Sequence, residues 1–129
     1  MGLILGPMPE KPPQRKVLFV EDEEALQTSY RRYFAGRYAM AFARSGADAM
    51  KQLDAFTPDI LVLDMRLPDT DGIALLQKIR EQSPALPVVV TTAYSSMEPL
   101  MGVLDLEHSG YLVKPFDLDD LAARIDAVG

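Results

Sequence analysis

The chain has 129 residues and a formal net charge of −6, a length that suits one domain with a single core. Hydrophobic residues make up 48% of the sequence, which excludes a disordered tail, and the lack of cysteine excludes disulfides and cysteine-based zinc sites. The acidic balance disfavours direct binding to nucleic acid, because the phosphate backbone would be repelled. No apolar run approaches the roughly 20 residues of a membrane span, so we expect a soluble, cytoplasmic protein that binds no membrane.

Residues 1–15 (MGLILGPMPEKPPQR) contain four prolines and show neither helical nor strand periodicity. We expect this segment to be a flexible N-terminal extension that lies outside the folded core. The pattern changes at residue 16, and one domain is predicted over residues 16–129.

Within this domain, short apolar runs alternate with helical patterns. In chain order, we predict a strand at 17–20, a helix at 21–34, a strand at 38–43, a helix at 45–53, a strand at 60–63, a helix at 73–80, a strand at 88–92, a helix at 97–106, a strand at 111–113 and a helix at 118–128. Ser45 and Asp71 are placed to cap two of the helices. Three strands are apolar without alternation, which is typical of parallel strands covered on both faces. The predicted fold class is therefore α/β, an open doubly wound sheet with helices on both sides.

Polar groups stand at the end of, or directly after, four of the predicted strands. In sheets of this kind, ligands bind beyond the carboxyl ends of the strands, where the strand order reverses. The residues at these ends are Glu21 and Asp22 after the first strand, Asp64 after the third, Thr91 and Thr92 in the fourth, and Lys114 after the fifth. Three acids, a hydroxyl and an ammonium group are thus expected to meet at one edge of the sheet.

These residue types predict a metal and a phosphoryl group. Three carboxylates brought close together repel one another, and a bound divalent cation removes that conflict. Oxygen ligands without histidine or cysteine favour Mg²⁺. Lys114 and Thr92 then need an anionic target, which a phosphoryl group provides. We therefore predict phosphoryl transfer to a carboxylate, with Asp64 as the nucleophile.

Two further acids lie close to Asp64 in the sequence. Asp69 and Asp71 follow Pro68, which ends the strand, so both are expected on the connecting loop. We interpret them as a turn former and a helix cap.

Four segments carry a resemblance to a known family. VLFVEDEE, PDILVLDMRLPDTDG, PVVVTTAY and GYLVKPF, in this order and at these intervals, resemble the receiver domain of bacterial two-component response regulators, the CheY-like superfamily. The resemblance covers about residues 16–129. It implies a flavodoxin-like, five-stranded parallel sheet of order 2-1-3-4-5.

The resemblance also implies roles for individual residues. Asp64 would accept a phosphoryl group from a sensor histidine kinase or a histidine phosphotransfer protein. The implied metal site holds Mg²⁺ through Asp22, Glu21 acting through water, Asp64 and the backbone carbonyl of Arg66. The implied phosphate contacts and switch residues are the Thr92 hydroxyl, the Lys114 amine, the backbone N–H groups of Ala93 and Met65, and the switch aromatic Tyr111. A cis peptide bond would precede Pro115 and aim Lys114 inward. Because successive strand residues face opposite sides, only one of Thr91 and Thr92 can reach the phosphate. As a strand aromatic, Tyr111 is equally compatible with a place in the core.

The implied function is a signalling switch in which phosphorylation changes the surface formed by the fourth helix, fifth strand and fifth helix. An output domain or target protein and a phosphorylation-dependent homodimer are compatible with it. The domain would be no enzyme beyond slow self-dephosphorylation. The sequence departs from the family at Glu107-His108, where members often carry Gly-Ala, and the preceding helix contains Pro99 and Gly102. We therefore hypothesise that this helix is short or mobile.

Two other functions are considered. An aspartate-nucleophile phosphatase of the haloacid-dehalogenase type would carry a second aspartate two residues after the first, where this chain has Arg66. The other is an interaction module that has lost phosphorylation, against which the complete set of acids, Thr92 and Lys114 argues.

Overall fold

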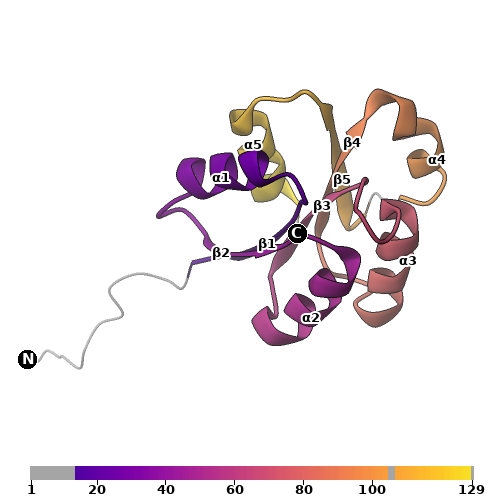
Figure 1. Cartoon of the computed structure of the whole chain (residues 1–129), viewed down its shortest axis with the longest axis horizontal. Coiled ribbons are helices and arrows are strands. Elements are labelled where there is room, and N and C mark those ends of the chain that lie inside the picture. The colour runs from indigo at the N-terminus through magenta and orange to yellow at the C-terminus, as the bar shows by residue number, and fades with distance from the viewer. Residues whose placement is uncertain (1–13, 105–106, 129) are drawn as a thin grey trace, which may run out of the picture.

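The computed structural model describes residues 14–104 and 107–128, and it contains one five-stranded sheet (Figure 1). The strands are β1 (Lys16–Val20), β2 (Ala39–Ala43), β3 (Ile60–Asp64), β4 (Val88–Ala93) and β5 (Ser109–Lys114). All neighbouring strands are parallel, in the order β2-β1-β3-β4-β5. The strand order reverses between β1 and β3, as predicted.

Helices cover both faces of the sheet. They are α1 (Glu24–Tyr33), α2 (Gly46–Phe56), α3 (Gly72–Gln82), the short α4 (Met97–Met101) and α5 (Leu118–Ala127). One core cluster joins the sheet to α2, α3 and α4, and the other joins it to α1 and α5, an arrangement visible in Figure 1. No helix within the described residues is long and apolar enough to cross a membrane.

The central strands supply side chains to both clusters. In β1, Leu18 and Val20 pack on the α2 and α3 side, whereas Val17 and Phe19 pack on the α1 and α5 side. All four are at most 1% exposed. This two-sided burial explains why the strand is apolar without alternation.

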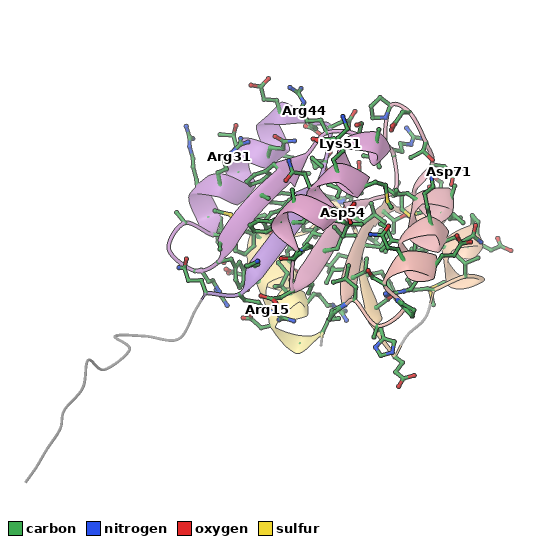
Figure 2. All side chains as sticks on the ribbon, turned by 90° about the horizontal axis from the view of Figure 1, so that it is seen from below. Arg15, Arg31, Arg44, Lys51, Asp54 and Asp71 are labelled. Carbon is green, nitrogen blue, oxygen red and sulfur yellow. The ribbon has the colours of Figure 1, made fainter. Side chains whose placement is uncertain are left out.

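The two predicted helix caps are confirmed. The Ser45 side chain accepts a hydrogen bond from the Asp48 N–H, and the Asp71 side chain accepts one from the Ala74 N–H. Figure 2 shows Asp71 at the beginning of α3.

Several element boundaries differ from the prediction. Helix α1 begins at Glu24 instead of residue 21, because the Glu21 N–H donates to the Ala43 carbonyl at 2.9 Å and so extends the β1–β2 pairing. Tyr33, one of the apolar residues at helical spacing in this segment, is 39% exposed. The helix predicted at 97–106 ends at Met101, which confirms that it is short, and residues 105–106 lie outside the described part.

Most of the predicted N-terminal extension, residues 1–13, also lies outside the described residues. Arg15, which the prediction assigned to this extension, contacts the domain. Its guanidinium donates to the carbonyls of Ile125 and Val128, and Figure 2 shows it beside α5.

Candidate functional site

A cleft of about 300 Å³ opens at the carboxyl ends of the central strands. Its walls include Glu21, Asp22, Asp64, Met65, Arg66, Leu67, Pro68, Ala93, Ser96 and Lys114. These residues come from the ends of four different strands and the segments that follow them, which is where a parallel open sheet binds its ligands.

Three acids meet in this cleft. Glu21, Asp22 and Asp64 each offer one carboxylate oxygen, and these oxygens lie within 4.8 Å of one another. Glu21 is 2% exposed and Asp64 is 5% exposed, whereas Asp22 faces solvent. Three oxygen donors at this spacing could hold a metal ion, as the sequence predicted.

Lys114 reaches the same group from β5. Its amine lies 3.1 Å from Asp64 Oδ1 and 3.3 Å from Glu21 Oε1. The peptide bond between Lys114 and Pro115 is cis, as predicted. The amine therefore bridges the two buried carboxylates of the cluster.

The buried acids resist ionisation. Burial, together with the charge of Asp64, raises the pKa of Glu21 to about 7, although the Glu23 N–H and Lys114 act in the opposite direction. Burial also raises the pKa of Asp64, against the opposing effect of Lys114. The two carboxylates in turn raise the pKa of the Lys114 amine, although burial of the amine acts against them. One ammonium group thus faces more negative charge than it can neutralise.

The two threonines of β4 are both buried. Thr91 pairs with Asp64 in the sheet register, and Thr92 precedes Ala93, which lines the cleft. The Thr92 hydroxyl is fully buried and donates to the Ala93 carbonyl at 3.1 Å, so it does not form part of the cleft wall. A role for this hydroxyl in binding phosphate therefore stays a prediction.

The backbone after Asp64 has a different arrangement from the one expected. The Met65 N–H donates to the Thr91 carbonyl at 3.1 Å and thus belongs to the strand pairing. The N–H that is hydrogen-bonded to the Asp64 carboxylate is that of Arg66. The Arg66 side chain is exposed at the rim of the cleft.

Tyr111 does not line the acid cleft. It is half-buried in β5 and packs against the cluster on the α3 and α4 side. It also lines a separate groove with Met97, Met101 and Val113. Its position is compatible with either of the two roles considered for it, so its role as a switch aromatic stays a prediction.

Ser96 and Gln27 are among the residues at or beside this site that sequence reasoning missed. Ser96 lines the cleft from a short 3-10 helix, Tyr94–Ser96. Gln27 is 4% exposed, and its side-chain amide donates to the Glu21 carbonyl. Gln27 lies three and seven residues before Tyr30 and Phe34, both buried, and a polar residue on that helical stripe was the available signal.

The family comparison agrees with the fold and the site geometry. The model of the response regulator receiver domain matches residues 17–126, so the chain belongs to the response regulator receiver domain family. It is 33% identical over 115 residues to the DNA-binding transcriptional regulator NtrC of Escherichia coli K12, covering 88% of this chain and 24% of that protein. It is 35% identical over 114 residues to the response regulator MprA of Mycobacterium leprae, covering 88% and 50%. The chain thus spans between about a quarter and half of these relatives.

Solved structures give the same result. The Francisella response regulator 1452 receiver domain matches with a TM-score of 0.77 and 30% identity, over 87% of this chain and 93% of that one. The BeF3-activated receiver domain of Klebsiella pneumoniae RstA matches with a TM-score of 0.77 and 27% identity, over 87% and 96%. The expected flavodoxin-like receiver fold and the class of signalling domain are confirmed.

Proposed function

We propose that Asp64 accepts a phosphoryl group from the phosphohistidine of a sensor histidine kinase or a histidine phosphotransfer protein. The observation that carries the proposal is the contact of the buried Asp64 carboxylate with Lys114 at 3.1 Å, inside a cleft that also holds Glu21 and Asp22. An Asp64 oxygen attacks phosphorus, the bond from phosphorus to the donor nitrogen breaks, and the imidazole leaves with that electron pair.

The residues of the cleft suit a phosphoryl group. The Lys114 amine is in place to neutralise the oxygens of the transferring group. The N–H groups of Ala93 and Arg66 can donate to the same oxygens. The Met65 N–H is a less suitable donor, because it is already hydrogen-bonded to the Thr91 carbonyl. Thr92 joins them once its hydroxyl leaves the Ala93 carbonyl.

The donor set fits Mg²⁺. Oxygen ligands from Glu21 (through water), Asp22 and Asp64, with the Arg66 carbonyl, match the preference of this cation. Burial raises the pKa of both Glu21 and Asp64, so a cation beside them would favour their ionised forms. When bound, Mg²⁺ would supply that charge and neutralise the transferring phosphoryl oxygens.

An apolar groove beside the cleft provides a docking place for the donor. It has a volume of about 500 Å³ and is lined by Leu26, Ser29, Lys114, Pro115, Phe116 and Leu118. Lys114 belongs to both the groove and the acid cleft. A donor helix seated here would hold its histidine close to Asp64, and apolar contacts would stabilise the complex.

The new contacts of the phosphoryl group would bias two states of the domain. Thr92, and through it Tyr111 beside α4, would transmit the change to the surface of α4, β5 and α5. That surface would then bind an output domain, a target protein or a second copy of the chain. In this proposal, the domain works in the cytoplasm and catalyses no reaction beyond its own phosphorylation and slow dephosphorylation.

The proposal is tested by incubating the protein with acetyl phosphate and Mg²⁺ and measuring its intact mass. We expect the wild type to gain one phosphoryl group, and Asp64→Asn to gain none. Asp71→Asn, in the same loop, is the matched control and should be labelled like the wild type. Chelation of the metal should prevent labelling. A labelled Asp64→Asn variant, or an unlabelled wild type, would overturn the proposal.

A further inference from the structure

The loop that follows Asp64 is fastened to the beginning of α2. Asp69 Oδ1 accepts a hydrogen bond from the Gly46 N–H at 2.7 Å, and Oδ2 accepts one from the Ala47 N–H at 3.0 Å. The next N–H, that of Asp48, donates to the Ser45 hydroxyl at 3.1 Å. The first three N–H groups of α2, which have no acceptor inside the helix, are therefore all satisfied by side chains. Two of them are satisfied by a residue of a different loop.

Loop and helix are also in close contact. Gly46 is buried, and a Cβ atom at this position would lie 2.6 Å from Thr70 Cγ2 and 3.3 Å from Asp69 Oδ1. A side chain at this position would require the side chains of Thr70 and Asp69, or the loop itself, to shift. The hydrogen bonds of Asp69 are thus supported by packing of the same loop on the helix.

The fastened loop carries part of the acid cleft. Its base is closed by the Gly72 N–H, which donates to the Met65 carbonyl at 2.8 Å, and by a bridge between Arg66 and Asp71. Arg66, whose carbonyl is the proposed metal ligand, thus belongs to this base, three residues before Asp69. The loop is therefore held at its base by its own backbone and at its tip by Asp69.

The segment that leads into α2 also contacts Glu21. Ala43, three residues before Gly46, accepts the Glu21 N–H at 2.9 Å. The segment 43–47 thus contacts the chain next to Glu21 on one side and the loop of Asp64 on the other. This segment therefore connects the part of the proposed metal site around Glu21 with the part around Asp64.

We propose that Asp69 is a positioning residue of the metal site: by bracing the loop on α2, it holds the Arg66 carbonyl and Asp64 in the geometry that binds Mg²⁺. The inference rests on the proposed function and deepens it. Groups that hold metal ligands in place commonly change affinity roughly ten- to a hundredfold when they are removed. An Asp69 carboxylate offers two acceptors at a helix N-terminus, and an asparagine offers only one.

The test measures Mg²⁺ affinity of the full chain by isothermal titration calorimetry. We expect Asp69→Ala to weaken binding roughly tenfold. Asp69→Asn should fall between Asp69→Ala and the wild type, because it keeps one acceptor. Circular dichroism verifies that each variant is folded. If Asp69→Ala is not folded, Asp69→Asn alone is compared with the wild type.

Ser45→Ala is the matched control. It removes a side-chain acceptor from the same end of α2 but does not touch the loop, so it should lower stability and leave the Mg²⁺ dissociation constant within roughly twofold of the wild type. The inference is overturned if Asp69→Ala binds Mg²⁺ as tightly as the wild type. If Asp69→Ala does not fold, the same criterion applies to Asp69→Asn. The inference is also overturned if Ser45→Ala weakens binding as much, because α2 itself would then be responsible.

A second readout separates this inference from the proposed function. In the acetyl phosphate reaction, Asp69→Ala should need more Mg²⁺ for half-maximal labelling but approach the wild-type rate at saturating Mg²⁺. An unlabelled wild type would overturn the proposed function and this inference with it. A labelled wild type together with an unchanged Mg²⁺ requirement in Asp69→Ala would overturn the role of Asp69 alone.

Discussion

Tyr38 and Arg37 fasten the last helix to the segment that enters β2. The Tyr38 hydroxyl donates to Asp126 Oδ1 at 2.6 Å, and Arg37 forms an ion pair with the same carboxylate. Although partial burial acts in the opposite direction, these hydrogen bonds lower the pKa of Asp126. A carboxyl group whose pKa is lowered by folding stabilises the protein above its unfolded pKa, and this stabilisation is lost as the pH falls through the folded pKa.

Tyr38→Phe tests this linkage, because it keeps the ring beside Phe34 and removes the donor. We expect a loss of about 0.5 kcal/mol at neutral pH, the low end for a hydrogen bond because Asp126 is half exposed. The loss should begin to shrink as the pH falls below the ordinary pKa of an aspartate, about 4, and should vanish below the lowered pKa of Asp126. Urea unfolding at a series of pH values measures it.

Tyr33→Phe is the control for that experiment, because this ring is 39% exposed and the Asp126 carboxylate contacts Tyr38 and Arg37 instead. It should change stability little at any pH. A Tyr38→Phe deficit that stays constant down to pH 2 would show that the bond to the Asp126 carboxylate does not carry the effect.

At the residue scale, the sequence located the groups that stand at strand ends. Asp64 and Lys114 directly end apolar runs, so their place at the sheet edge follows from the strand pattern alone. Asp69 was interpreted as a turn former, because its partners Gly46 and Ala47 lie more than 20 residues away. The contact of Arg80 with β5 was missed for the same reason, because its guanidinium donates to the hydroxyl of Ser109, 29 residues away.

At the scale of elements, periodicity predicted all five strands and the five main helices, and the errors lie at their ends. The N-terminus of α1 was predicted too early because backbone pairing of Glu21 with β2 outcompetes helix formation. β5 begins two residues earlier than predicted, at Ser109. Its first residues are polar or glycine, so pairing with β4, which the sequence does not display, decides where it begins.

Helix α4 is the least supported helix of the described chain, since it has five residues and only Leu100 is buried. Gly102 follows it with a right-handed helical φ of −72°, and a Cβ atom there would meet only the Pro99 carbonyl, at 3.5 Å. We expect Gly102→Ala to stabilise this region by roughly 0.5–1 kcal/mol. Native-state hydrogen exchange should show slower exchange of the Met101 and Val103 amides than in the wild type.

The wild type supplies the comparison for that measurement. Its α4 amides should exchange faster than those of α3, where Leu75, Leu76 and Ile79 are buried. Equal protection of both helices in the wild type would contradict the view that α4 is weakly held.

For the whole molecule, the acid cleft sets a condition on stability. Glu21 and Asp64 are buried with raised pKa values and share one lysine, so their charge opposes folding when no cation is bound. A cation that binds only the folded state removes this penalty and adds its own binding free energy.

We therefore expect Mg²⁺ to raise the free energy of unfolding by about 2.7 kcal/mol at a hundred times its dissociation constant. Thermal unfolding followed by circular dichroism measures the effect, and chelation should reverse it. Asp22→Asn should lose most of the gain, whereas Asp119→Asn, in the exposed first turn of α5, should keep it. The same ionic strength supplied as NaCl controls for screening. Equal gains from NaCl and Mg²⁺ would contradict a specific site.

The hydrogen bonds between Arg15 and the end of α5 have a mechanical consequence. Its guanidinium holds the Ile125 and Val128 carbonyls, so the entrance to the first strand and the exit from the last helix form one corner of the molecule. That corner lies at the amino end of β1, whereas the acids lie at the carboxyl ends of the strands. A load tethered at either place would therefore act on both, at a corner that the length of β1 separates from Glu21.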